Sequence, residues 1–181
     1  MELEDFKKEL NQQDATGIII LQLALTMGVV FFSAVIFLLF FTQKQEPANP
    51  ESAELINLLS IITGILAFSS IMFFIMIPKL RYKNDTLKGI FESNKPVQSF
   101  MAQFRATRIL QIVILEGGAL LGGVTCLLAV FNGVMGNNSI YWANLTPAVI
   151  MVIISLANLP TKTHLYNQFK YLQDNYSLVK R

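Results

Sequence analysis

The sequence predicts an all-α membrane protein with four transmembrane helices, and three observations support this prediction. Hydrophobic residues make up 53% of the 181 positions and charged residues only 14%, whereas a soluble domain carries about 25% charged residues. The segments between the apolar stretches are short and polar, so we expect residues 1–181 to form a single four-helix transmembrane domain. A helix needs about 20 apolar residues to cross a bilayer, and four stretches approach or exceed that length: residues 18–41, 56–77, 109–131 and 142–159.

The basic residues are unevenly distributed, and their positions predict the orientation of the protein in its membrane. Lys and Arg collect in the short cytoplasmic loops of membrane proteins. Seven of them fall in the segment 78–108, between the second and third spans. We therefore expect this segment to be cytoplasmic, and with four crossings the N-terminus and the tail 160–181 lie on the same side. The predicted location is the bacterial inner (plasma) membrane, as a multi-pass protein.

The residues before the first span form a short amphipathic stretch. Leu3, Phe6 and Leu10 recur at helical spacing among Glu and Lys, which predicts a cytoplasmic helix with one apolar edge. That edge would lie on the inner leaflet or against the bundle. The first apolar run, residues 18–41, is too long for the core of a cleavable signal peptide, so we expect it to remain as a span.

The first and third spans resemble each other. Residues 21–28 align without gaps on residues 110–117, and both begin with a Leu-Gln pair and end in Gly. The second and fourth spans both finish in an apolar residue followed by proline, at Pro78 and Pro160. Proline lacks an N–H donor and restricts the residue before it, so each is expected to stop its helix. We therefore predict a tandem duplication of a two-helix hairpin, with the halves related by an axis along the membrane normal.

Two cytoplasmic segments have helical patterns of their own. Pro96 suits the first position of a helix that runs into the third span, and Leu165, Phe169 and Leu172 recur on one face after the fourth span. These short amphipathic helices would either lie on anionic lipid head groups or cap the cytoplasmic end of the bundle. The sequence leaves both alternatives open.

Between residues 109 and 131 the only Asp, Glu, Lys or Arg is Glu116. At roughly 1.5 Å per residue it lies on the order of 12 Å beyond Arg108, where a charged group is expensive to keep. The candidate neighbours of this intramembrane carboxylate are Arg108, Gln111 and Gln22. Glu116 would be either a protonated group in an interhelical hydrogen bond, or a functional carboxylate that binds and releases a proton or cation.

Small side chains surround this carboxylate in the third span. Membrane helices approach one another closely where their side chains are small, because lipid supplies no hydrophobic drive between them. We therefore predict helix packing through Gly117, Gly118, Ala119, Gly122 and Gly123.

Other chemistry finds little support in the sequence. His164 is the only histidine, and Cys, His, Asp and Glu form no cluster with metal-ligand spacing. Phosphate-binding loops, dinucleotide-binding motifs and paired nucleophile and base residues are missing too. We therefore expect no enzyme, no cofactor and no metal. The positive-inside rule already accounts for the basic segment, so we expect no nucleic-acid partner.

The third span resembles segments of two groups of known membrane proteins. Arg108, the run 115–119 and Pro160 are similar to the corresponding positions of small four-span bacterial membrane proteins of undefined function. The same span more distantly resembles the helix of rotary-ATPase proteolipid (c-type) subunits, in which Glu is followed by Ala, an aliphatic pair, Gly and Val. The matching positions here are Glu116, Ala119, Leu120, Leu121, Gly122 and Val124.

The predicted duplication is also similar to double-length proteolipids in which one hairpin has lost its carboxylate, because Met27 aligns with Glu116. However, the fourth span contains no glycine, and the carboxylate lies in the third span rather than at the end of a hairpin. We therefore do not expect a working rotor subunit.

Two functions remain as expectations. The first is an integral membrane structural or accessory subunit that packs and oligomerises through its Gly-rich third span. Its partners would be the lipid bilayer and either further copies of the chain or a larger membrane complex. The alternative is a small proton- or cation-coupled transporter, or a proteolipid-like ion-handling protein, that uses Glu116.

Overall fold

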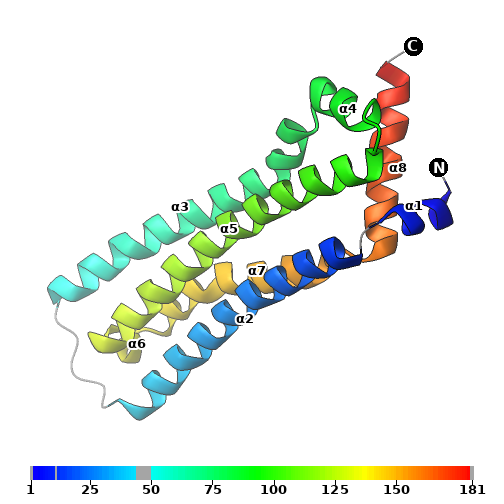
Figure 1. Ribbon diagram of the computed structural model, residues 1–181. Helices are drawn as coiled ribbons and strands as arrows, with labels where there is room; N and C mark the ends of the chain where they lie inside the picture. The colour runs from blue at the N-terminus through cyan, green and yellow to red at the C-terminus, as the bar shows by residue number, and fades with distance from the viewer. Residues whose placement is uncertain (1, 11, 44–49, 180–181) are drawn as a thin grey trace.

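The structure is a computed structural model that describes residues 2–10, 12–43 and 50–179, and this part of the chain is helical with no strand (Figure 1). The all-α prediction is confirmed. The elements in chain order are α1 (Leu3–Glu9), α2 (Gln12–Thr42), α3 (Pro50–Arg81), α4 (Asn84–Phe91), α5 (Pro96–Phe131), α6 (Val134–Asn137), the 3-10 helix η1 (Ser139–Leu145), α7 (Thr146–Ala157) and α8 (Lys162–Val179).

Four helical segments are long and apolar enough to cross a membrane, as the sequence predicts: Ala15–Thr42, Pro50–Arg81, Pro96–Phe131 and Ser139–Ala157. Large apolar side chains point outward along them. Phe31 is 71% exposed, Ile61 62% and Phe68 63%. Apolar surface of this extent is costly in water but suits contact with lipid chains. The protein therefore has the surface of a multi-pass membrane protein.

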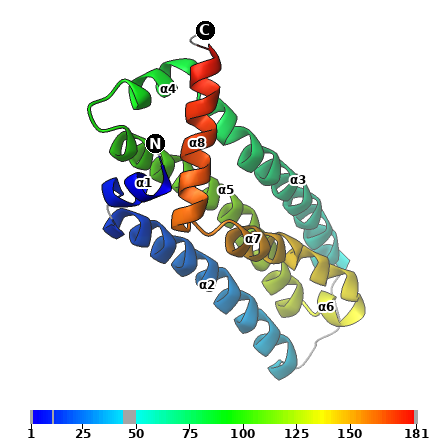
Figure 2. The ribbon, with the colours of Figure 1, turned by 90° about the vertical axis from the view of Figure 1, so that its right-hand side faces the viewer.

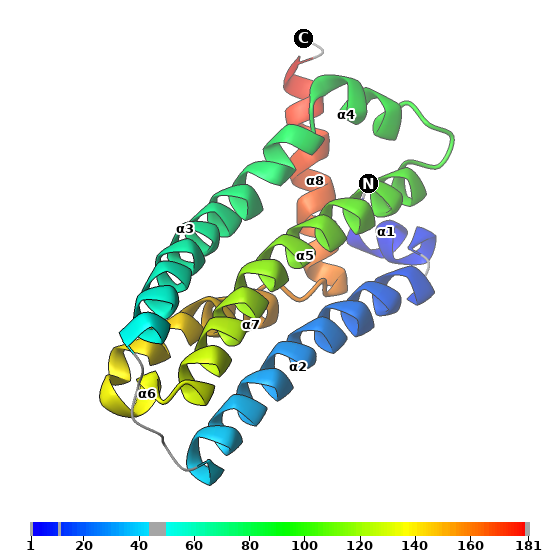
Figure 3. The same ribbon diagram turned by 90° about the vertical axis from the view of Figure 1, so that its left-hand side faces the viewer.

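Helix α5 lies at the centre of the bundle and packs against α2, α3 and α7. Half of its most apolar stretch is buried, compared with 17% for α2 and 11% for α3. Figure 3 shows α5 between α3 and α2, with α7 behind it, and Figure 2 shows the opposite side, where α7 lies in front. One side of α5 therefore remains uncovered, between α2 and α3.

Helices α1, α4 and α8 gather at one end of the bundle, here called the α8 end (Figure 1). Their apolar side chains pack with the first turns of α5. The ring of Phe6 lies 6.5 Å from that of Phe100 and 5.2 Å from that of Phe169, measured between ring centroids. Leu87, Ile90, Leu165 and Leu172 are buried in the same cluster. Of the two alternatives for these segments, the contacts favour a cap on the bundle.

Two details differ from the sequence prediction. Helix α3 does not stop at Pro78 but continues to Arg81, because the carbonyl that proline leaves unpaired finds another donor, as described below. The fourth span begins as a 3-10 helix, η1, in which the Asn138 side chain accepts a bond from the Ile140 amide at 3.0 Å. The predicted start of a helix at Pro96 is confirmed.

Candidate functional site

The most polar part of the membrane-spanning bundle is a cluster around Arg108 of α5, near the α8 end. Arg108 is only 6% exposed. Its Nε donates to the Gln22 side-chain oxygen at 3.1 Å, and its Nη2 donates to the backbone carbonyl of Asn158. The guanidinium also lies 5.7 Å from the centre of the Phe74 ring, within cation–π range. Side chains or backbone from all four spans therefore meet at one arginine.

Backbone carbonyls that lack helical partners explain why polar side chains gather here. Pro78 has no N–H, so the carbonyl four residues earlier, that of Phe74, loses its helical donor. The Gln111 side-chain amide donates to this carbonyl at 2.8 Å. The end of α7 also leaves carbonyls without partners, and the arginine satisfies one of them. The cluster thus replaces hydrogen bonds that the helices themselves cannot make.

Gln22 connects α2 to the same end of α7. Its side-chain amide donates to the Ser155 carbonyl, while its oxygen accepts from Arg108. One turn further along α2, the Thr26 and Ser155 hydroxyls lie 2.6 Å apart, within hydrogen-bond distance. Gln22 is completely buried. These bonds fix the register of α2 against α7.

No carboxylate lies within 4 Å of the Arg108 guanidinium among the side chains that the structure describes. The C-terminal end of α7 supplies partial negative charge through its last carbonyls. That charge is smaller than a full unit, so the cluster retains net positive charge.

A cavity of about 210 Å³ adjoins the guanidinium. It is lined by Phe74, Ile75, Pro78, Tyr82, Phe104, Thr107, Arg108, Gln111, Asn158, His164 and Gln168. The Tyr82 hydroxyl is buried and has no hydrogen-bond partner in the described part of the chain. Burial raises the pKa of Tyr82 to about 12, and the Thr107 hydroxyl and the Arg81 charge offset only part of that effect. Burial, and then the charge of Arg108, lower the pKa of His164.

Glu116 lies apart from this cluster. Its side chain is half-buried, and no hydrogen bond or ion pair joins it to a residue that the structure describes. The three neighbours suggested by the sequence, Arg108, Gln111 and Gln22, bond instead with one another and with carbonyls of α3 and α7. Glu116 therefore forms no hydrogen bond with any of these three side chains in the described part of the chain.

Three of the predicted glycines are positions of close helix contact inside the bundle. A Cβ atom on Gly122 would lie 2.1 Å from the Asn144 carbonyl oxygen, and one on Gly123 would lie 2.5 Å from the Phe32 ring. On Gly118 it would approach the Ser70 hydroxyl at 3.2 Å. Ala119 is 1% exposed in the same core.

Gly117 differs from these residues. It is exposed, and a Cβ atom there would meet nothing within 4 Å. Because α5 turns this residue toward its uncovered side, Gly117 makes no packing contact within the chain. Of the predicted packing residues, Gly117 is therefore the one that is open to a partner outside the chain.

Further polar pairs join the helices toward α6. The Thr63 and Thr125 hydroxyls lie 3.1 Å apart and link α3 to α5. The Asn144 side chain donates to the Ser60 hydroxyl at 2.9 Å, which links η1 to α3. Each of these groups has its partner inside the bundle, so they hold helices together rather than line a polar path.

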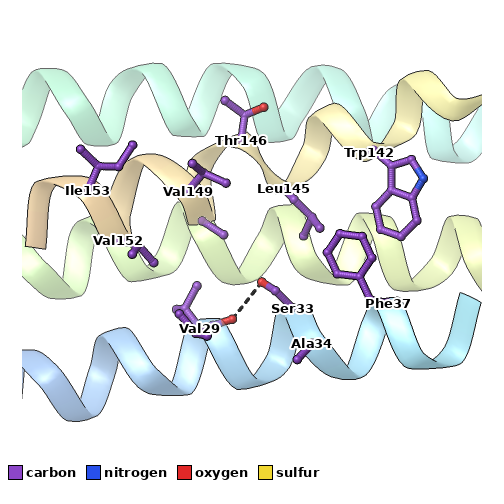
Figure 4. A pocket seen from close by; sticks show the side chains of 12 residues that line it. Val29, Ser33, Ala34, Phe37, Trp142, Leu145, Thr146, Val149, Val152 and Ile153 are labelled. Atoms are coloured by element: carbon purple, nitrogen blue, oxygen red, sulfur yellow. Dashed lines mark hydrogen bonds between the residues drawn. The ribbon is translucent and has the colours of Figure 1, made fainter. Parts of the chain in front are cut away.

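A larger groove of about 710 Å³ runs between α2 and the η1–α7 segment (Figure 4). Phe37 and Trp142 close one end with stacked rings whose centroids are 4.5 Å apart. The lining is mostly aliphatic, and the Ser33 hydroxyl donates to the Val29 carbonyl at 2.9 Å. Such a surface suits lipid chains and offers no catalytic groups.

The part of the chain that the structure describes holds no group of three His, Cys, Asp or Glu side chains able to bind a metal ion. Comparisons with known proteins add no assignment, because no protein-family model, curated protein or solved structure matches the chain.

Proposed function

We propose that this protein is an integral membrane structural or accessory subunit that associates with further copies of itself through the uncovered side of α5. The observation that carries the proposal is the unpaired, half-buried Glu116 beside the open, exposed Gly117. A lone carboxyl group in lipid gains free energy when it finds a hydrogen-bond partner. A glycine beside it allows a second helix to approach closely.

The rest of this side of α5 is apolar. Val113, Leu120 and Val124 are exposed on the arc between Glu116 and Gly117. A shallow groove of about 470 Å³ continues from Gly117 toward α3. The groove is lined by Leu66, Ser69, Ser70, Phe73, Val113, Ile114, Gly117 and Gly118. A transmembrane helix would fit this surface better than a water-soluble partner.

A second copy of the chain suits the surface because each of its groups is self-complementary. A two-fold interface brings a surface patch against the same patch of its partner. A neutral carboxyl group carries both a donor and an acceptor, so two Glu116 side chains can bond to each other. Apart from Glu116, the stretch from Val113 to Val124 carries no charged side chain, so this part of the surface requires no oppositely charged partner.

The test is energy transfer between donor-labelled and acceptor-labelled protein in liposomes as the protein-to-lipid ratio is raised. Wild-type protein is expected to associate. Gly117→Leu should shift association to a protein-to-lipid ratio about tenfold higher, since the added side chain separates the helices. The matched control is Gly64→Leu, because Gly64 of α3 is also exposed and open but lies away from this side of α5.

Monomeric wild-type protein, or equal association of the two leucine variants, would overturn the proposal. The lack of a partner for Glu116 would then favour the alternative, a proton- or cation-handling protein. Infrared difference spectroscopy in lipid distinguishes the two, with Glu116→Gln as the control. A carboxyl band that titrates between about pH 5 and 9 indicates an exchangeable proton, whereas a constant protonated band indicates a structural hydrogen bond.

We also propose the orientation, with the α8 end in the cytoplasm of a bacterium and the membrane as the inner membrane. The basic segment between α3 and α5 supports it, because this segment lies at the same end as α1 and α8. We further propose that the chain is a tandem duplication of a two-helix hairpin, because residues 21–28 align with 110–117. We also propose that it is similar to small four-span bacterial membrane proteins, on the basis of Arg108, residues 115–119 and Pro160.

A further inference from the structure

The cavity beside Arg108 is lined by several hydrogen-bond donors that the fold does not use. Arginine has five N–H donors, and the bonds to Gln22, Gln111 and Asn158 use three of them. Two N–H groups, one on each terminal nitrogen, are left for another acceptor. The Tyr82 hydroxyl is a further buried donor without a partner.

His164 is the third residue that contributes a donor to this lining. Its Nε2 lies 3.2 Å from the amide nitrogen of Gln168. With that amide donating, a neutral His164 carries its proton on Nδ1. Burial lowers the pKa of His164, and the charge of Arg108 lowers it further.

These donors come from different elements and approach the cavity from different directions. Arg108 belongs to α5, Tyr82 follows α3, and His164 lies in the first turn of α8. Donors spread in this way suit an anion with several acceptor oxygens better than a neutral ligand. A buried cation without a counter-ion also favours an anion over a second cation.

A second cavity adjoins the first on the side that faces the surface. It has a volume of about 290 Å³ and shares Pro78, Tyr82, His164 and Gln168 with the first. The second cavity is also lined by Tyr171, which is 66% exposed. It lies between the end of α3 and α8, where the membrane-spanning helices give way to the helices of the cap.

We propose that this cavity is a binding site for a phosphate-class oxyanion, held by Arg108 together with Tyr82 and His164. The oxygens of the anion accept from the two remaining guanidinium N–H groups and from the tyrosine hydroxyl. Arginine pairs with phosphate through parallel hydrogen bonds as well as charge. The anion can be a free phosphate or the head group of an anionic lipid, since both present the same chemistry at this depth.

The test uses the full-length protein purified in detergent and has two arms. In the first, inorganic phosphate is titrated against chloride at constant ionic strength while the melting temperature is recorded. In the second, native mass spectrometry measures retention of phosphatidylglycerol against zwitterionic phosphatidylcholine. A phosphate-dependent rise in melting temperature identifies the free anion, and selective retention of phosphatidylglycerol identifies the lipid. Both outcomes support the site.

Three variants locate the binding. Tyr82→Phe removes a hydroxyl that has no partner at normal hydrogen-bond geometry in the described part of the chain. It should weaken binding about three- to tenfold and change the melting temperature of the unliganded protein only slightly. Tyr171→Phe is the matched control, because its hydroxyl lies on an exposed residue of the neighbouring cavity. Arg108→Gln should abolish binding.

Arg108→Gln can also unfold the protein, because Arg108 satisfies a helix carbonyl, so Tyr82→Phe is the decisive variant. The proposal is overturned if the wild type retains neither ligand, or if Tyr82→Phe binds as tightly as Tyr171→Phe. Neither result bears on self-association, which involves the uncovered side of α5 and not this cavity.

Discussion

Gln111 of α5 donates a hydrogen bond of 2.8 Å to the Phe74 carbonyl of α3, the carbonyl that Pro78 leaves without a helical donor. A side chain of one span thus supplies the hydrogen bond that the backbone of another span lacks. Inside a bundle of membrane-spanning helices, a backbone carbonyl without a donor is costly. The pair explains how a proline is tolerated inside a membrane-spanning helix, and it ties α3 to α5.

This relationship predicts a coupled pair of substitutions. Gln111→Leu leaves the Phe74 carbonyl unpaired and should lower the free energy of unfolding by about 1–3 kcal/mol. In a Pro78→Ala background the new N–H at position 78 restores the helical bond, so the same substitution should cost clearly less. A double-mutant cycle on unfolding in mixed micelles measures the coupling. Additive effects would contradict this explanation.

The glycines of α5 predict a contrast in stability. Gly122→Leu places its Cβ atom 2.1 Å from the Asn144 carbonyl oxygen, and backbone at that distance has to move. We expect a large loss of stability, seen as a lower melting temperature in detergent. Gly117→Leu, on the uncovered side, should melt within a few degrees of the wild type. Equal melting of Gly122→Leu and the wild type would refute the close contact.

The spans could be predicted from the sequence, but the polar cluster could not. Apolar runs of about 20 residues have few alternatives to membrane helices, so the four spans were predicted near their observed places. The sequence places Arg108 and Gln111 near Glu116 because they precede it on the same helix, and Gln22 because it aligns with Gln111. Their partners include backbone carbonyls of α3 and of the end of α7. Every residue has a backbone carbonyl, so the pattern of side chains does not show which carbonyls need a donor.

One signal could have indicated the cluster. The sequence pattern predicts that Pro78 and Pro160 stop their helices, but a proline within a span also frees the carbonyl four residues before it. A buried Gln or Arg elsewhere is then the natural donor. The glycines show a second limit, since Gly117 and Gly118 are neighbours in sequence and only the orientation of α5 decides which one is buried.

Glu116→Gln tests whether the intramembrane carboxyl group is neutral. An amide has nearly the same shape and also carries a donor and an acceptor. If the carboxyl group is protonated in the membrane, the variant should melt and self-associate as the wild type does at pH 7. Glu116→Leu keeps the apolar surface but removes the hydrogen bond, so it should weaken association. If Glu116→Gln associates much less than the wild type at pH 7, association requires a charged carboxylate and not a neutral carboxyl group.

The single histidine predicts a pH dependence of stability. Burial and the Arg108 charge lower the pKa of His164 in the folded protein below the ordinary value of 6.5. Near that pH the unfolded chain binds a proton more readily than the folded protein, so the free energy of unfolding rises with pH in this window. Stability should therefore fall as the pH is lowered from about 7 through 6.5 and below.

His164→Asn should flatten this dependence between about pH 5 and 7, because the chain has no other histidine. Nuclear magnetic resonance of the imidazole in micelles measures the folded pKa directly. An oxyanion bound beside Arg108 would offset the charge that opposes protonation, so adding phosphate should move the pKa of His164 upward. An imidazole that titrates at or above 6.5 without phosphate would contradict the lowered pKa that burial and the Arg108 charge give His164.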